Sequence, residues 1–406
     1  MIALLRKYNL LLIAAGLVLG LLVAGLSPRL TSILGVFGYI FLNALKFLVI
    51  PLIFLSVTVG IAGMGDLRNM GKIARVTIAY YLLTSVIAVV LGLVLVVSMR
   101  PGDGVPPPTE HYTREAKSAL DFVDSMVPSN FFAALVETEA IPIILVAILF
   151  GVFLVRYRDE FPQVRAFVFR LNDAVLYLVR ALMLFAPLGI MGLVAGILGA
   201  KGGWTEIGHA LAGIGRYSLV VIVGLTIHSF IILPLILLVL GRRSVIRYAY
   251  GVLSAILTAF ATASSSATLP ETIRCSEDNN KVTPSTVGFV LPLGATINMD
   301  GTALYEAVAV IFISQAYGIA MGPFELIVVA ITATLASIGA AGIPEAGLVT
   351  MVLVLNAVGL PVEGIALILV IDWLLDRYRT AVNVWGDCVG AAVVDRRLEA
   401  ASPTVS

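Results

Sequence analysis

Long apolar runs separated by short charged loops constrain this chain more than any other feature. Only 13% of its residues are charged, whereas an average soluble domain has roughly 25% and a water-soluble surface needs about a quarter to a third of its residues charged. We therefore predict an all-α polytopic membrane protein with eight transmembrane helices. The expected crossings are Tyr8–Leu26, Phe37–Ala62, Ile73–Met99, Ile141–Val155, Ala174–Ala200, Tyr217–Leu240, Val287–Tyr317 and Ile365–Val394.

Charge is unevenly divided between the loops. Lys and Arg gather in every second loop, as in Arg156–Arg170 and Arg242–Arg247, and few occur in the others. Because cytoplasmic loops are enriched in Lys and Arg, both termini are expected in the cytoplasm. The compact external loop of 101–130 and the short tails favour a prokaryotic inner or plasma membrane.

The net charge of +1 provides no basic surface for nucleic acid. The two cysteines, Cys275 and Cys388, have neither a disulfide framework nor the spacing of metal ligands. We expect no nucleic-acid partner and no resident cofactor.

Two further apolar segments are too short to cross and are interrupted by small residues. The first, Gly251–Ala263, would reach only about 20 Å as a helix, and Ser264–Pro270 follows at once. The second consists of Leu326–Ser337 and Leu348–Leu360, which flank a tip rich in Gly and Ala. We predict two re-entrant helical hairpins, with ordinary loops as the alternative.

Each predicted hairpin precedes one long helix with polar residues in mid-span. The two units, about Gly241–Gly318 and Gly322–Arg397, would enter the membrane from opposite faces and form inverted repeats. Secondary transporters of several folds place their sites where such repeats meet.

Polar residues on the last predicted span repeat at helical spacing. Each charged side chain at mid-membrane costs ~2.5–3.5 kcal/mol, so the stripe must face an aqueous cavity, other charges or a charged ligand. The alternative is a buried ion network that only fixes the orientation of the helix. The stripe consists of Asp372, Asp376, Arg379, Thr380, Asn383 and Asp387.

A zwitterionic acid would suit these groups. Arg379 offers a planar fork for a carboxylate, and Asp376 accepts hydrogen bonds from an ammonium group. Backbone amides at the tip beside Ser264–Ser266 favour an anion. A ligand with two carboxylates and one amine would use all three.

Polar residues also interrupt the seventh predicted span. Asn298 and Asp300 would point to different faces of a regular helix, so with Gly301 beside them we predict local unwinding that frees backbone carbonyls. Hard oxygen ligands suit sodium, and the lack of soft ligands argues against zinc, copper or iron. The candidate sodium ligands are Asn298, Asp300, Asn383 and Asp387, joined by Tyr81, Thr84 and Ser85, for which hydrogen bonding between helices is the alternative.

Glu306 lies in an otherwise apolar stretch about two turns beyond Asn298. Removal from water favours the neutral acid, so Glu306 is a candidate proton carrier. The alternative is a permanently paired structural carboxylate, with Arg377 as its partner.

Two other functional classes fit the sequence less well. A serine intramembrane protease needs a base beside its serine, and of His111, His209 and His228 only His228 lies in an apolar span, where we interpret it as structural. An aspartyl protease needs two facing aspartates, whereas Asp376 and Asp387 lie three turns apart on one helix. A dedicated anion channel would not need a bidentate arginine within its site.

Four motifs, in order, give the chain a family resemblance: Ser264–Pro270, Asn298–Glu306, Ala341–Pro344 and Asp376–Asp387. With them, essentially the whole chain resembles the dicarboxylate/amino acid:cation symporter family, which includes the animal excitatory amino acid transporters and archaeal aspartate transporters. The resemblance implies a homotrimeric, elevator-type symporter, not an enzyme, that imports L-aspartate and/or L-glutamate with sodium ions. A proton-coupled C4-dicarboxylate transporter of the same fold is the alternative.

The resemblance also implies a fixed scaffold and a moving transport domain. The scaffold would comprise helices one and two (1–70) and helices four and five (131–203), with the external loop at 101–130. The transport domain would comprise helix three (71–100), helix six (204–240), the first hairpin (241–283), the unwound helix seven (284–320), the second, gating hairpin (321–360), and helix eight with the cytoplasmic tail (361–406).

Individual roles follow from the same resemblance. Arg379 would pair with the side-chain carboxylate of the substrate and Asp376 with its amino group. Hydrogen bonds would come from Thr302, Thr380 and Asn383, and the α-carboxylate would be held at Ser264, Ser265, Ser266 and Gly342. Sodium ligation would fall to Gly294, Asn298, Asn383 and Asp387 at one site, to Tyr81, Thr84, Ser85 and Asp300 at a second, and to backbone around Thr296, Met299, Ser337, Ile338 and Ala340 at a third.

Four positions indicate which branch of the family this chain resembles. Ala263 stands where the archaeal relatives have arginine, while Arg377 supplies that charge from the last helix, as in the animal proteins. Glu306 also resembles the animal pattern, in which this glutamate carries the co-transported proton and is tied to potassium counter-transport. Glu345 departs from the glutamine or small residue expected at the second hairpin tip.

Overall fold

The computed structural model describes residues 2–26, 28–63, 71–107, 130–136, 139–199, 204–340, 342 and 344–399. Every regular element in these ranges is a helix, which confirms the all-α prediction. Several predicted features lie outside them: most of the loop 101–130 with His111, the tip residues Ala341 and Ile343, and the end of the C-terminal tail.

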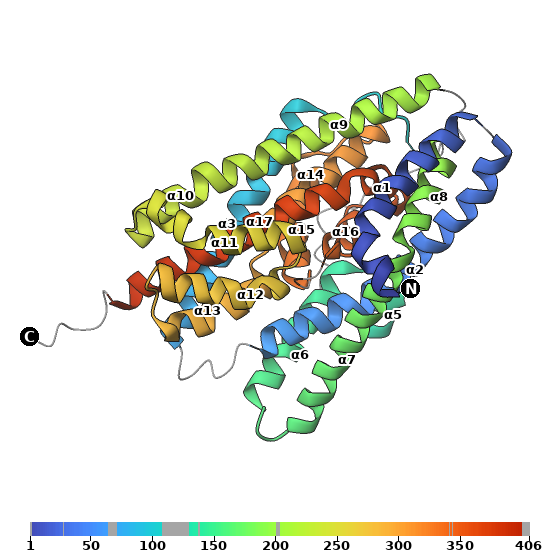
Figure 1. Cartoon of the computed structure of the whole chain (residues 1–406). Coiled ribbons are helices and arrows are strands. Elements are labelled where there is room, and N and C mark those ends of the chain that lie inside the picture. The colour runs from blue at the N-terminus through green and yellow to red at the C-terminus, as the bar shows by residue number, and fades with distance from the viewer. Residues whose placement is uncertain are drawn as a thin grey trace, which may run out of the picture.

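One group of helices combines the start of the chain with a segment from its middle, and Figure 1 shows it on one side of the molecule. Its members are α1 (Ile2–Leu26), α2 (Pro28–Ala62), α5 (Phe131–Val136), α6 (Ala140–Arg156), α7 (Pro162–Leu182) and α8 (Ala186–Gly199). Both α1 and α2 pack along α8, and α2 also contacts α6 and α7.

Glycines let α8 lie close against its neighbours. A Cβ atom at Gly192 would overlap the backbone of Leu34 and Gly38 on α2, and one at Gly16 would overlap the carbonyl of Pro187. Close approach of backbones through small residues is a common way to pack helices in a membrane.

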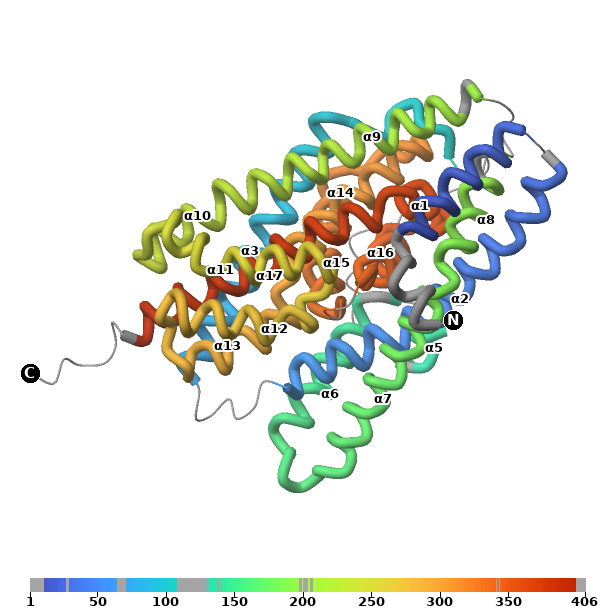
Figure 2. Tube along the Cα trace, in the orientation of Figure 1, coloured from blue at the N-terminus to red at the C-terminus, as the bar shows by residue number. Residues whose placement is uncertain are grey.

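The second group surrounds two central helices, α14 and α17, as the tube in Figure 2 shows. Its members are α3 (Gly71–Met99), α9 (Trp204–Ile227), α10 (Leu233–Ile236), α11 (Val245–Thr262), α12 (Ser265–Arg274), α13 (Pro284–Ile297), α14 (Asp300–Ala316), α15 (Pro323–Gly339), α16 (Ala346–Ala357) and α17 (Ile365–Glu399). Nearly every residue of α14 is buried, because α3, α9, α15, α16 and α17 all contact it.

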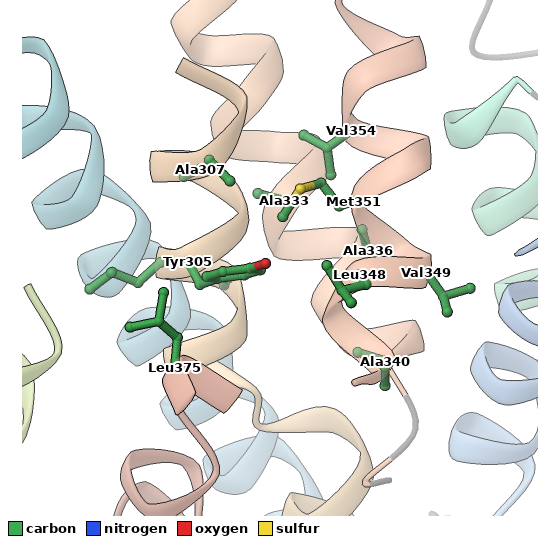
Figure 3. Close-up of a cluster of buried hydrophobic side chains, with 14 of the residues drawn as sticks. Tyr305, Ala307, Ala333, Ala336, Ala340, Leu348, Val349, Met351, Val354 and Leu375 are labelled. Carbon is green, nitrogen blue, oxygen red and sulfur yellow. The ribbon is translucent and has the colours of Figure 1, made fainter. Parts of the chain in front are cut away.

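Small side chains also bring the α15–α16 pair onto α14. Figure 3 shows Tyr305 of α14, Ala333 and Ala336 of α15, Met351 of α16 and Leu375 of α17 in one buried apolar cluster. This cluster covers one side of the polar residues described below.

Within the described residues, six helical segments are long and apolar enough to cross a membrane. Five overlap predicted crossings, and the sixth, Val245–Thr262, was predicted as a hairpin arm. The six are Arg29–Ala62, Gly71–Met99, Pro162–Gly196, Ile207–Gly241, Val245–Thr262 and Pro284–Ala316. The total of eight crossings stays a prediction.

The predicted bounds of the first hairpin arm were wrong. The helix begins at Val245, six residues before Gly251, and its 18 residues span about 27 Å at the usual rise. Length therefore does not exclude a crossing by α11. What does favour a hairpin is the reversal at Ala263, whose φ is 50°, after which α12 packs back against α11.

The fifth predicted span also began too late. The sequence interpretation began this span at Ala174, but α7 begins at Pro162 and continues through a 3-10 turn, Met183–Phe185, into α8. The first part of α7 is amphipathic and carries Arg165 and Arg170, so an apolar run could not reveal it.

The break in the seventh span is confirmed. Helix α13 ends at Ile297 and α14 begins at Asp300, with Asn298 and Met299 in non-helical conformations between them. A second irregularity was not predicted: His228–Ile232 and Leu237–Gly241 form π-helical turns on either side of α10, next to Pro234, which cannot donate a backbone hydrogen bond.

Replacing Gly192 by Ala should lower the thermal stability of the purified protein. The added methyl would push α8 away from α2, and overpacking of this kind costs about 1–3 kcal/mol. Gly215→Ala on α9 is the matched control, because nothing lies within 4 Å of its Cβ position. Equal melting temperatures for the two variants in detergent would contradict the close packing of α2 and α8.

Candidate functional site

The tips of the two helix pairs meet at Gly342. The Ser264 hydroxyl donates to the Gly342 carbonyl at 2.6 Å, and the Ser266 amide donates to the same oxygen at 3.1 Å. Ser264 also caps α12, since its Oγ accepts from the Ala267 amide at 3.1 Å. The start of α12 therefore lies directly against the loop between α15 and α16.

A buried arginine lies beneath these tips. Arg379 is 1% exposed, and its guanidinium lies 2.6 Å from Asp376 and 3.3 Å from Asp372. Its Cζ also lies 3.8 Å from the centre of the Tyr305 ring, a cation–π distance. Gly347 makes room for it, because a Cβ atom there would lie 2.8 Å from Nη1.

The predicted stripe on α17 is buried along its whole length. All six of its residues are at most 6% exposed. Asn383 connects it to α14, since its Oδ1 accepts from the Gly301 amide at 2.7 Å and its Nδ2 lies 3.4 Å from the Thr302 hydroxyl. Thr380 donates to the Asp376 carbonyl within α17 at 2.8 Å.

Glu345 connects the second tip to the same charges. Its backbone adopts a left-handed conformation, with φ 62°, and its amide donates to the Asp376 carboxylate at 2.9 Å. The backbone of this tip is therefore bonded to the carboxylate that the sequence analysis assigned to an amino group.

Both tips, α14 and α17 line one small cavity of about 10 Å³, room for about one water molecule. An amino acid therefore fits only if the tips separate or the side chains rearrange. The lining residues are Ala263, Ser265, Met299, Thr302, Ala340, Gly342, Ala346, Gly347, Asp376, Thr380 and Asn383.

A second polar cluster surrounds Asp300 at the start of α14. Its carboxylate accepts hydrogen bonds from Ser85 at 2.7 Å and from Thr84 at 3.2 Å, both on α3. His228 of the first π-turn approaches the other carboxylate oxygen, with its Nε2 at 3.2 Å. All four side chains are buried.

Asp387 forms a third cluster one turn beyond Asn383. Its Oδ1 accepts from the Asn298 amide group at 2.8 Å. A Cβ atom at Gly294 would touch both this carboxylate and the Tyr81 hydroxyl, so the three groups are adjacent. Tyr81 donates to Val290 at 2.7 Å, which places its hydroxyl beside Asp387 rather than in the bonded group around Asp300.

The third predicted sodium set is less connected. The hydroxyls of Thr296 and Ser337 donate to carbonyls of their own helices, and Met299 contacts Asn383 through its sulfur. Ile338 and Ala340 lie on the same helix end as Ser337, and α13 contacts α15. Within the described residues the Ala340 amide donates to the Ser337 carbonyl at 3.1 Å, but no hydrogen bond joins Thr296 or Met299 to that helix end, and the set stays a prediction.

Glu306 is fully buried on α14, where the Thr350 hydroxyl of α16 donates to its Oε1. The alternative in which Arg377 pairs with Glu306 was wrong. Its Nη1 donates to the carbonyls of Phe260 and Ala261 at 3.1 and 2.6 Å, at the C-terminal end of α11. An arginine there satisfies carbonyls that have no partner within the helix.

Comparison with known proteins decides the family. The sodium:dicarboxylate symporter family model matches residues 10–397 of this chain. The chain belongs to this family. The symporter is similar to human excitatory amino acid transporter 3, with 40% identity over 88% of this chain and 78% of the relative. It is also similar to excitatory amino acid transporter 1 of Ambystoma tigrinum, with 38% identity over 88% of this chain and 76% of the relative.

Members of this family are transporters, so the chain is a multi-pass membrane transporter and not an enzyme. The rat excitatory amino acid transporter 2 extends the similarity, with 37% identity over 92% of this chain and 74% of the relative. The three relatives all come from animals, so they lend no support to the prokaryotic source expected from the short loop and tails.

Sequence reasoning did not assign several residues that contact the site of the symporter. Asp372 was placed in the stripe without a role, although its spacing of seven residues from Arg379 indicated a shared face. Thr350 and Tyr305 gave no signal, because their contacts join separate helices. His228 was interpreted as structural, but its partner Asp300 could not be identified from local spacing.

Asp372→Asn should destabilise the symporter. Arg379 would stay buried with one carboxylate in place of two, and removing one partner of a buried ion pair costs about 3–5 kcal/mol. We expect a clear fall in melting temperature in detergent without substrate.

The control is Glu363→Gln, which breaks the partly exposed pair between Lys46 and Glu363 and should change the melting temperature less. Equal effects of the two substitutions would show that Asp372 does not compensate the charge of Arg379.

Proposed function

We propose that this symporter imports L-aspartate and/or L-glutamate together with sodium ions, with a proton as a further co-substrate. The observation that carries this proposal is the buried Arg379, with Asp376 beside it, below the meeting point of the two tips. A cation and a carboxylate in one occluded site complement an amino acid that bears an additional carboxylate. The names of the related excitatory amino acid transporters agree with this class of substrate.

Substrate binding would replace contacts between side chains of the site by contacts with the substrate. Arg379 would turn from Asp376 toward the side-chain carboxylate of the substrate, and Asp376 would take the amino group. The tip around Ser265 and Gly342, where α12 begins, would receive the α-carboxylate, because amides at a helix N-terminus attract anions. Thr302, Thr380 and Asn383 border the same cavity and would add hydrogen bonds.

Sodium ions would bind where buried oxygens gather. Asp300 with Thr84 and Ser85 forms one such group, and Asp387 with Asn298 forms another beside Gly294 and Tyr81. The Oδ1 atom of Asn298 has no hydrogen-bond partner within the described part of the chain, which leaves an oxygen for a cation. The hard oxygen character of both groups favours an alkali cation over a transition metal.

The two groups of helices support the proposed division into scaffold and transport domain. All the substrate and sodium residues proposed above lie in the second group, so they would move together if this group slides past the first. We propose the α11–α12 and α15–α16 pairs as the re-entrant hairpins, with both termini in the cytoplasm and three copies per assembly.

Uptake by proteoliposomes tests the proposal directly. The purified protein should accumulate radiolabelled aspartate or glutamate under an imposed sodium gradient, and more weakly or not at all without one. Uptake of succinate driven by a proton gradient alone would support the C4-dicarboxylate alternative instead.

Arg379→Gln should abolish uptake of acidic amino acids, measured on the fraction of the variant that a melting transition shows to be folded. The amide cannot balance a second carboxylate, and a lost charge-assisted contact in a buried site weakens binding by about 2–5 kcal/mol. Without the charge, the variant is expected to prefer neutral amino acids such as serine or alanine, so the uptake of these is assayed as well. Aspartate uptake at the wild-type rate would rule out the role assigned to Arg379.

Glu306→Gln should flatten the pH dependence of sodium-driven uptake. Gln keeps the size of the side chain and its contact with Thr350 but cannot release or accept a proton. The measurement is the initial rate of uptake at external pH values on both sides of neutrality. Glu325→Gln at the start of α15 is the control, and a wild-type pH profile in Glu306→Gln would remove the proton from the proposal.

A further inference from the structure

A groove with a basic rim lies away from the substrate cavity. It is found in the second helix group, at the end where the last turns of α17 lie. It has a volume of about 650 Å³ and opens between the start of α3, the end of α17 and the π-turn Leu237–Gly241. Its lining residues are Lys72, Arg75, Val76, Ala79, Tyr80, Leu83, Leu240, Val393 and Arg397.

Among the described residues that line the groove, three are cations and none is a carboxylate. Lys72, Arg75 and Arg397 are exposed, and no ion pair involves them within the described residues. Arg75 uses its Nε for the Gly71 carbonyl at 3.0 Å, which leaves its terminal nitrogens for another acceptor. The nearby Asp395 does not neutralise them, because it is buried and accepts from Arg243 at 3.1 Å.

The walls below the rim are apolar. Val76, Leu83 and Leu240 form a surface on which a hydrocarbon chain can lie, with the cations at its open end. A free phosphate ion would satisfy the rim but not this surface. Basic pockets between membrane helices on the cytoplasmic side suit anionic headgroups.

From this pairing of charge and apolar surface we propose that the groove binds one anionic phospholipid. The phosphate lies among Lys72, Arg75 and Arg397, and an acyl chain runs along α3 toward Leu83. The lipid thereby holds the start of α3 against the end of α17, two elements that are far apart in the sequence.

The inner wall of the groove leads to the ion site. Tyr80 lines the groove, and its hydroxyl donates to the Gly386 carbonyl of α17 at 3.0 Å. Its ring also packs against Gly390, where a Cβ atom would lie 2.7 Å from Cε1. Gly386 is adjacent to Asp387, so a bound lipid that fixes Tyr80 also fixes the backbone of a proposed sodium ligand.

Lipid binding is tested with the full-length protein in detergent, by native mass spectrometry and by melting temperature. We expect phosphatidylglycerol to remain bound and to raise the melting temperature at about tenfold lower concentration than phosphatidylcholine, because the rim cations attract its net negative headgroup. Lys72→Gln/Arg397→Gln should remove this preference. Arg170→Gln/Arg247→Gln is the control of equal charge, since both arginines are exposed and neither lines the groove.

A third variant separates a groove from a merely basic surface. Ala79→Trp fills the groove without changing the charge, so it should reduce retention of phosphatidylglycerol as strongly as the double variant does. The proposal would be overturned if Ala79→Trp retained as much phosphatidylglycerol as the wild type. It would also be overturned if the control variant lost as much of this lipid as Lys72→Gln/Arg397→Gln, or if inorganic phosphate displaced the lipid completely. None of these outcomes depends on the transported substrate; only the connection through Tyr80 to the proposed sodium ligand Asp387 rests on the proposed function.

Discussion

The structure depends on one buried cation. Arg379 is almost fully removed from water, and a guanidinium is tolerated there only because Asp376, Asp372 and the Tyr305 ring surround it. Both carboxylates lie on α17 itself, whereas the Tyr305 ring belongs to α14, so the cation–π contact joins this charged group of α17 to α14. Apolar residues of α15 and α16 pack beside Tyr305, as Figure 3 shows.

Interrupted helices are the second feature on which the site depends. Helix α13 stops at Ile297, α12 starts at Ser265, and both ends point into the region where the two helix pairs meet. Interrupted helices at membrane depth are tolerated when they are covered by protein or line a cavity. Here they bring free backbone groups and carboxylates together, which is what the binding of an acidic solute with small cations requires.

Features that follow the periodicity of a helix could be predicted from the sequence. The polar stripe on α17 was predicted from its spacing alone, and the break at Asn298 from two polar residues that no regular helix could place on one face. The same geometry could have corrected one error: Arg377 lies two residues before Arg379 and so points away from the stripe, toward α11. The start of α7 was missed because its charged, amphipathic turns contain no apolar run.

Contacts between helices distant in the sequence could not be predicted from local patterns. Thr350 contacts Glu306 and His228 contacts Asp300 only because α16 and the π-turn pack onto α14. The position of Tyr81 beside Gly294 likewise depends on how α3 meets α13. Such pairs are set by the tertiary fold, and the family resemblance supplied roles for Glu306, Asp300, Tyr81 and Gly294 without supplying their neighbours.

The most direct test of the account is the affinity of the purified symporter for aspartate as a function of sodium concentration, at constant ionic strength. If substrate and sodium share one buried, charge-balanced site, their binding is linked, and the affinity should rise at least about tenfold as sodium increases from about 1 to about 100 mM. Tight aspartate binding that is the same at both sodium concentrations, or no binding at either, would contradict the account.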